Sequence, residues 1–161
     1  MSERKYPEWM GKMLGLTADE ITLTFWPGRL WRVATIGDDG FRTSPRFGKS
    51  GTGHRCGLSR EKSTWIKHIQ ANSNVAVSCA LDVAPYTRLV MKGKAEIIEG
   101  PTPMAGKCLE VANRMAVRYL GERGPEYLVP TNDRPRYLVQ FTPSKTISWE
   151  GVEWHEKYLD K

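Results

Sequence analysis

The chain has 161 residues, of which 40% are apolar and 26% are charged, and its net charge is +6. This length and composition fit one soluble globular domain with its own core, which we expect to span residues 1–161. No apolar run approaches the roughly 20 residues that a membrane-spanning helix needs. The first residues also lack the apolar core of a signal peptide. We therefore expect no membrane partner.

The positive charge permits binding of nucleic acid or of anionic ligands but proves neither, because no run of five or more basic residues occurs. Acidic and basic residues interleave, so we attribute the excess partly to a pocket for anionic groups and partly to solvated surface. Nucleic acid is not the expected partner. Cys56, Cys79 and Cys108 are an odd, widely spaced set, which favours free thiols and a reducing, cytoplasmic setting.

The first third of the chain predicts an arm, a short helix and a β-hairpin. Residues 1–16 read as an irregular or partly helical arm. Thr17 and Glu20 have the spacing of a capping box, which opens a helix ending near Phe25. Strands are predicted over residues 30–36 and 41–47, joined at Asp38-Asp39-Gly40, where the glycine tolerates positive φ. After a glycine-rich turn without the spacing of a Walker loop, residues 54–58 are predicted as the third strand.

The stretch from Cys56 to Leu81 predicts a strand, a polar turn, a helix and another strand. The turn, residues 58–64, holds three hydroxyl groups and two cations, and Ser63 or Ser59 can cap the helix that follows. The helix, residues 64–71, places Trp65, Ile66 and Ile69 on one side. Residues 75–81 alternate as a strand. The turn suits a phosphate or carboxylate, but a capped surface helix with solvated cations explains it equally well.

The second half of the chain predicts a long strand, a longer helix and a final strand. Residues 87–98 alternate as a strand, and Gly93 should mark a bend or bulge. A helix is expected to begin at Pro101-Thr102-Pro103, with Thr102 as N-cap, and to end at Gly121. Residues 137–141 are predicted as a strand, which residues 147–149 extend before a tail over 150–161. Five to seven strands at hairpin-like spacing, with one interposed short helix and one longer helix, predict a mainly β small barrel with flanking helices.

Few residues in the sequence form a recognisable catalytic or metal-binding motif. The sequence shows no paired-carboxylate or nucleophile motif, and the three histidines, His54, His68 and His155, have no metal-binding spacing. His54 and Cys56 share one strand face and could supply two ligands, but nothing supplies the others, so we predict no metal site. This absence suits a protein whose chemistry is carried by a cofactor. The catalytic residues remain unknown at this point.

Several segments in order resemble the pyridoxamine 5'-phosphate oxidase-like, FMN-binding split β-barrel family. The resemblance covers roughly residues 30–98, and it rests on the following segments: Arg32–Gly40, Ser44–Phe47, Lys67–Val75 and Arg88–Glu96. It implies FMN bound at the interface of a homodimer, with a small-molecule substrate. Carried over by position, it implies cofactor contacts at these residues: Arg46, Lys49, Leu58, Ser59, Lys62, Ser63, Thr64 and Arg88.

At two places the sequence differs from the family pattern, and these differences limit what the resemblance implies. Trp65 stands where the family commonly has a phosphate-binding lysine, so Lys62 or Arg60 would have to supply the charge. The paired arginines that bind substrate in the vitamin-producing oxidase are absent after Phe141, which favours a general FMN-dependent oxidoreductase. Three alternatives stay open: a deazaflavin cofactor, haem with His54, His68 or His155 as axial ligand, and a non-enzymatic module that binds a flavin, another anion or nucleic acid.

Overall fold

The computed structural model describes residues 13–25, 29–40, 42–43, 46–47, 56–84 and 86–151, with only the backbone at 13–14, 42–43 and 46–47. The strands are β1 (Met13–Leu14), β2 (Trp31–Ile36), β3 (Arg42–Thr43), β4 (Arg46–Phe47), β5 (Cys56–Arg60), β6 (Asn74–Ala80), β7 (Arg88–Thr102) and β8 (Arg136–Glu150). The helices are α1 (Ala18–Phe25), α2 (Thr64–Ala71) and α3 (Gly106–Leu120), with 3-10 turns η1 (Gly124–Tyr127) and η2 (Val129–Thr131).

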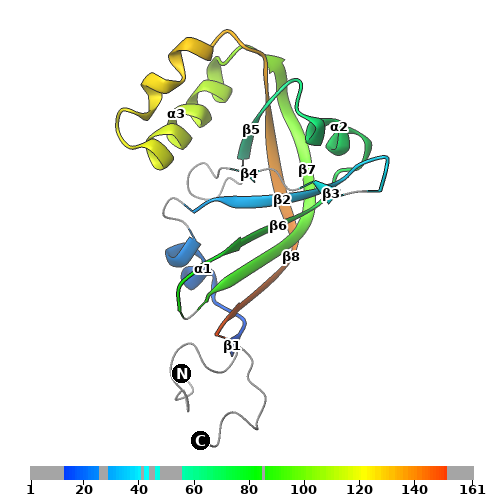
Figure 1. Cartoon of the computed structure of the whole chain (residues 1–161), viewed down its shortest axis with the longest axis vertical. Helices are drawn as coiled ribbons and strands as arrows, with labels where there is room; N and C mark the ends of the chain where they lie inside the picture. The colour runs from blue at the N-terminus through cyan, green and yellow to red at the C-terminus, as the bar shows by residue number, and fades with distance from the viewer. Residues whose placement is uncertain are drawn as a thin grey trace, which may run out of the picture.

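The long antiparallel pair of β7 and β8 is the centre of the sheet (Figure 1). The strand order is β1-β8-β7-β6-β2-β3; β5 pairs with β8, and β4 pairs with β2. The predicted mainly β barrel with flanking helices is therefore confirmed. The predicted strand over residues 41–47 is present as two short pieces, β3 and β4, and the two segments predicted near the C-terminal end form one continuous strand, β8.

Helix α2 packs its apolar side into the barrel core. Trp65, Ile66 and Ile69 are buried against strand residues such as Val77 and Met91, whereas Lys67 and Gln70 on the outer side of the helix are exposed. This division follows from the amphipathic spacing, and the helix has the bounds that the sequence predicts. The capping box before α1 is also confirmed, since the Glu20 backbone N–H donates to the Thr17 hydroxyl and the Thr17 N–H donates to the Glu20 carboxylate.

Gly93 lies where β7 bends across β8. The strand pairing shifts register between Lys92 and Gly93, which confirms the predicted bulge. A Cβ at Gly93 would collide with the carbonyl oxygen of Thr142 and lie 2.7 Å from Cα of Pro143. Only glycine permits so close an approach of the two backbones.

The third helix begins later than the sequence predicts. Thr102 is the last residue of β7 and pairs with Arg136, and α3 starts at Gly106 with Ala105 in the N-cap position. The prediction was wrong because pairing with a distant strand holds the Pro-Thr-Pro segment extended. Gly121 ends α3 with a φ of +84°, as expected. The helix packs Cys108, Val111 and neighbouring side chains against β5 and β8.

All three cysteines are buried free thiols. In the described part of the chain, no helix is long and apolar enough to cross a bilayer.

Candidate functional site

The junction between β5 and α2 gathers four of the predicted cofactor-binding residues. Ser59 lies near the end of β5, Lys62 and Ser63 form the turn, and Thr64 begins α2. The Ser63 N–H donates to the Arg60 carbonyl at 3.0 Å, and the Glu61 N–H donates to the Pro135 carbonyl at 3.3 Å. These bonds fix the turn against the segment that leads into β8.

The start of α2 has the properties of an anion site. Ser63 occupies the N-cap position, but its hydroxyl makes no capping hydrogen bond, so the sequence-based suggestion of a side-chain cap is not met there. The first turn of α2, which the structure describes fully, holds no acidic residue. Exposed Lys62 and Thr64 flank this positive helix end, and exposed Glu61 offsets part of the charge.

Ser59 and Leu58 point to opposite faces of β5, as alternation along a strand requires. Ser59 is buried and its hydroxyl donates to the Arg60 carbonyl at 3.3 Å. Leu58 packs with the clusters beneath α3, beside Val111 and Cys108. Leu58 therefore belongs to the packing of α3 rather than to the polar turn.

Arg88 lies far along the sheet from the turn in the same protomer. Ser59 pairs with Tyr137 near the start of β8, whereas Arg88 pairs with Trp149 near its end, twelve residues further along. A straight strand of that length spans about 40 Å, and the bend of β8 shortens this only in part. Figure 1 shows the same separation, with β5 and α2 at one end of the long β7–β8 pair and the start of β7 at the other.

The remaining predicted positions divide into three cases. Trp65, the departure from the family pattern, is buried in the barrel core and does not line the turn. Arg46 lies in β4 and pairs with Arg32, but only its backbone is described. Lys49 falls outside the described residues, as do His54 and His155.

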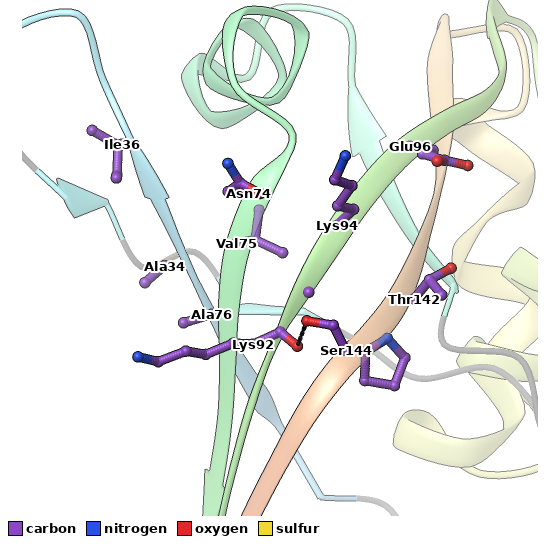
Figure 2. Close-up of a pocket in the computed structure, with 12 residues that line it drawn as sticks. Ala34, Ile36, Asn74, Val75, Ala76, Lys92, Lys94, Glu96, Thr142 and Ser144 are labelled. Carbon is purple, nitrogen blue, oxygen red and sulfur yellow. Dashed lines mark hydrogen bonds between the residues drawn. The ribbon is translucent and has the colours of Figure 1, made fainter.

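A second feature, a shallow groove of about 570 Å³, lies on the outer face of β2, β6, β7 and β8. Its floor is made of small residues such as Ala34, Ala76 and Gly93. Figure 2 shows the Lys92 side chain reaching across β6 towards β2 and Lys94 standing further along β7. The Ser144 hydroxyl donates to the Lys92 carbonyl at 3.2 Å, which fastens β8 to β7 beside the groove.

Sequence reasoning did not identify this groove as a site. The signal was present, because Ala76, Ser78 and Ala80 alternate with the buried residues of β6, and Lys92 and Lys94 alternate with those of β7. What the sequence lacks is the pairing of β2 beside β6, which puts Ala34 next to Ala76. A floor of small side chains edged by lysines can accept a planar group or a second protein surface.

The side chain of His68 contacts a residue of β2. Its Nδ1 lies 3.0 Å from the Thr35 hydroxyl, and its Nε2 lies 2.9 Å from the position that a Cβ on Gly37 would take. The described residues contain no group of three or more histidine, cysteine or acidic side chains that could hold a metal ion.

The chain matches no protein-family profile and no curated protein sequence. Solved structures do resemble it. A conserved hypothetical protein from Mycobacterium tuberculosis gives a TM-score of 0.70 at 23% identity, over 85% of this chain and 86% of that one. An F420 reductase gives 0.60 at 22%, over 78% and 94%. The haem storage protein HutZ from Vibrio cholerae gives 0.62 at 15%, over 84% and 96%.

Identities this low establish the fold alone. The resemblance predicted from the sequence is confirmed at that level, since the similar structures also include a putative pyridoxamine 5'-phosphate oxidase from Listeria innocua. The chain has the split β-barrel fold that pyridoxamine 5'-phosphate oxidase-like proteins share.

Proposed function

We propose that the chain binds FMN, with the phosphate group at the junction of β5 and α2, and that it acts as an oxidoreductase on a small-molecule substrate. The observation that carries this proposal is the start of α2, where the Ser63 hydroxyl does not cap the helix. The Ile66 N–H already donates to the Ser63 carbonyl, so the Ser63 and Thr64 hydroxyls and the positive end of the helix dipole are the features that suit a phosphate.

Three residues at the turn would contact the phosphate: Lys62, Ser63 and Thr64. Lys62 would neutralise phosphate charge in place of the lysine that Trp65 replaces, while Ser63 and Thr64 would donate hydrogen bonds to phosphate oxygens. A bound flavin supplies the electron transfer, and the protein binds it, orients it and limits its contact with water. Ser59 is buried at the strand end that leads into the turn.

A second copy of the chain would complete the site. Arg88, which the family resemblance assigns to the flavin, is at the far end of the β7–β8 pair from the turn of its own protomer. A homodimer that apposes two sheets could bring the Arg88 of one protomer towards the turn of the other. The outer-face groove, with its floor of Ala34, Ala76 and Gly93, is the surface that would take part in such an approach. The three buried thiols agree with a reducing, cytoplasmic setting.

A deazaflavin is the second candidate cofactor, because one of the similar structures is an F420 reductase. Haem is the third, because another is a haem storage protein. Among the described residues His68 would have to be the axial ligand, and it would first have to leave Thr35 or bind iron through its other nitrogen. A non-enzymatic flavin-binding module would show binding without turnover.

The test is titration of the purified protein with FMN, with a deazaflavin and with hemin, followed by visible absorption spectra. FMN binding is expected, and a nicotinamide nucleotide should then bleach the flavin bands if the protein is a reductase. The variant Ser63→Ala, Thr64→Ala should weaken FMN binding, whereas Ser73→Ala at the other end of α2 should not. Failure to take up FMN would overturn the proposal, and uptake of a deazaflavin or hemin in its place would favour that alternative cofactor.

A further inference from the structure

A pocket of about 580 Å³ lies on the α3 side of β5, between that strand, the start of β8 and α3 with its following turns. Most of its lining is apolar: Leu58, Met104, Met115, Tyr119, Tyr127 and Leu128. Tyr127 at its edge is 71% exposed, so the pocket is open to solvent there. Its volume is in the range of about 300–1,000 Å³ that is usual for sites of small organic ligands.

Two guanidinium groups line this apolar pocket. Arg60 and Arg136 are directly opposite in the pairing of β5 with β8, so their side chains leave the same face of the sheet. Nη2 of Arg136 donates to the Thr131 hydroxyl at 3.1 Å. Nη1 of Arg136 is buried and has no hydrogen-bond partner. Among the described residues, no carboxylate forms an ion pair with either arginine.

This arrangement is unfavourable without a ligand. Burial, and after it the positive charge of Arg60, lower the pKa of Arg136. An arginine nevertheless keeps its proton in a protein, so the charge remains and its solvation is only partly replaced. Like charges directly opposite on neighbouring strands also repel. An anion between the two guanidinium groups would remove the repulsion and replace part of the lost solvation.

We propose that this pocket binds an aromatic carboxylate, with the carboxylate between Arg60 and Arg136 and the ring among Met104, Met115 and Tyr119. Planar guanidinium groups pair with planar carboxylates through two parallel hydrogen bonds. Methionine sulfur and tyrosine rings make favourable contacts with an aromatic body. The site is separate from the proposed flavin site, because Arg60 and Ser59 leave opposite faces of β5.

The probe is 1-naphthoate, with binding measured by isothermal titration calorimetry. 1-Naphthalenemethanol carries the same ring without charge, and acetate carries the charge without a ring. We expect naphthoate to bind at least about ten-fold more tightly than either control compound, as one charge-assisted contact predicts. Equal binding of naphthoate and the alcohol, or no binding of naphthoate at millimolar concentration, would overturn the proposal.

Variants locate the site. Arg136→Met should raise the Kd for naphthoate by about ten-fold or more. Arg60→Met, at an exposed position, should do the same and keeps the test decisive if Arg136→Met does not fold. Arg134→Ala is the control, since Arg134 is exposed and does not line the pocket. Saturating naphthoate should leave the affinity for FMN unchanged, whatever that affinity is. Competition between naphthoate and FMN would contradict a separate pocket. An equal loss of naphthoate affinity in Arg134→Ala would contradict this location of the site.

Discussion

The hydroxyl oxygen of Thr35 lies 3.0 Å from Nδ1 of His68, and this contact joins β2 to α2. Thr35 is fully buried. Its side chain is therefore a polar group inside the protein whose hydrogen bond also orients the imidazole ring. The contact therefore links β2 to α2, the helix whose first turn is the predicted anion site.

Thr35→Val should lower the free energy of unfolding by about 1–2 kcal/mol. Valine has nearly the shape of threonine, but it leaves a partly buried imidazole nitrogen without this partner. Urea denaturation followed by circular dichroism measures the change. Thr146→Val, at an exposed position on β8, is the control and should change stability by less than about 0.5 kcal/mol. Equal effects of the two substitutions would mean that the Thr35–His68 contact contributes no net stability.

Gly93→Ala should lower the free energy of unfolding by about 3 kcal/mol or prevent folding. The added Cβ would collide with the carbonyl oxygen of Thr142, which is backbone and cannot turn away, so β7 and β8 would have to separate at the bulge. Thermal melting measures the loss. Gly106→Ala is the matched control, since Gly106 has a φ of +50° but nothing within 4 Å of its added Cβ. Gly106→Ala should lower the free energy of unfolding by only roughly 1–2 kcal/mol, the cost of a left-handed backbone for a residue with a side chain. A similarly small loss for Gly93→Ala would contradict the steric argument.

These residues show which parts of the structure the sequence predicts. Local signals predicted the bounds of α2 and the capping box at Thr17, because each depends on neighbours in the chain. The glycine alone predicted the bulge at Gly93, although the approach of Thr142 that requires it is a long-range contact. The start of α3 was mispredicted because the pairing of Thr102 with Arg136 is a long-range contact. The pocket beside Arg136 escaped sequence reasoning for the same reason, since only strand register brings Arg60 opposite it.

The stability of the protein should fall more steeply above pH 9 than that of a Cys56→Ala, Cys108→Ala variant. Burial is the main cause that raises the pKa of both thiols above the ordinary value of 9.0. The unfolded chain therefore releases these protons at lower pH than the folded chain, so their contribution to stability is complete below pH 9 and declines as pH rises beyond it. Urea midpoints from pH 7 to 10 measure the difference, and parallel curves for the two proteins would contradict it.

Lys62→Ala should weaken FMN binding by about ten-fold to a hundred-fold. A charge-assisted contact contributes roughly 1.5–3 kcal/mol, and each 1.4 kcal/mol corresponds to one decade in Kd. Lys67→Ala is the control, since Lys67 is exposed and lies one helical turn beyond the start of α2. Fluorescence titration with FMN compares the two variants. An unchanged Kd for Lys62→Ala would assign the phosphate charge to another cation, such as Arg46, Lys49 or Arg88.

Mixing two defective variants should restore FMN sites if the site is shared between protomers. In a dimer of one Lys62→Ala chain and one Arg88→Ala chain, one site combines the intact Lys62 of one protomer with the intact Arg88 of the other, and the second site lacks both. After random exchange of subunits, roughly a quarter of all sites should therefore be intact. The measurement is bound flavin, at an FMN concentration that fills the unmodified protein but neither variant alone.

The separation along β8 makes the result of this mixing experiment easy to interpret. Ser59 and Arg88 pair with residues twelve positions apart on that strand. Within one protomer, Arg88 therefore lies far from the turn between β5 and α2. Differently tagged chains verify that mixed dimers have formed, and a mixture of Lys62→Ala with itself gives the baseline. If verified mixed dimers bind no more flavin than that baseline, either Arg88 does not contact the cofactor or each protomer holds its flavin alone, and the shared site is wrong.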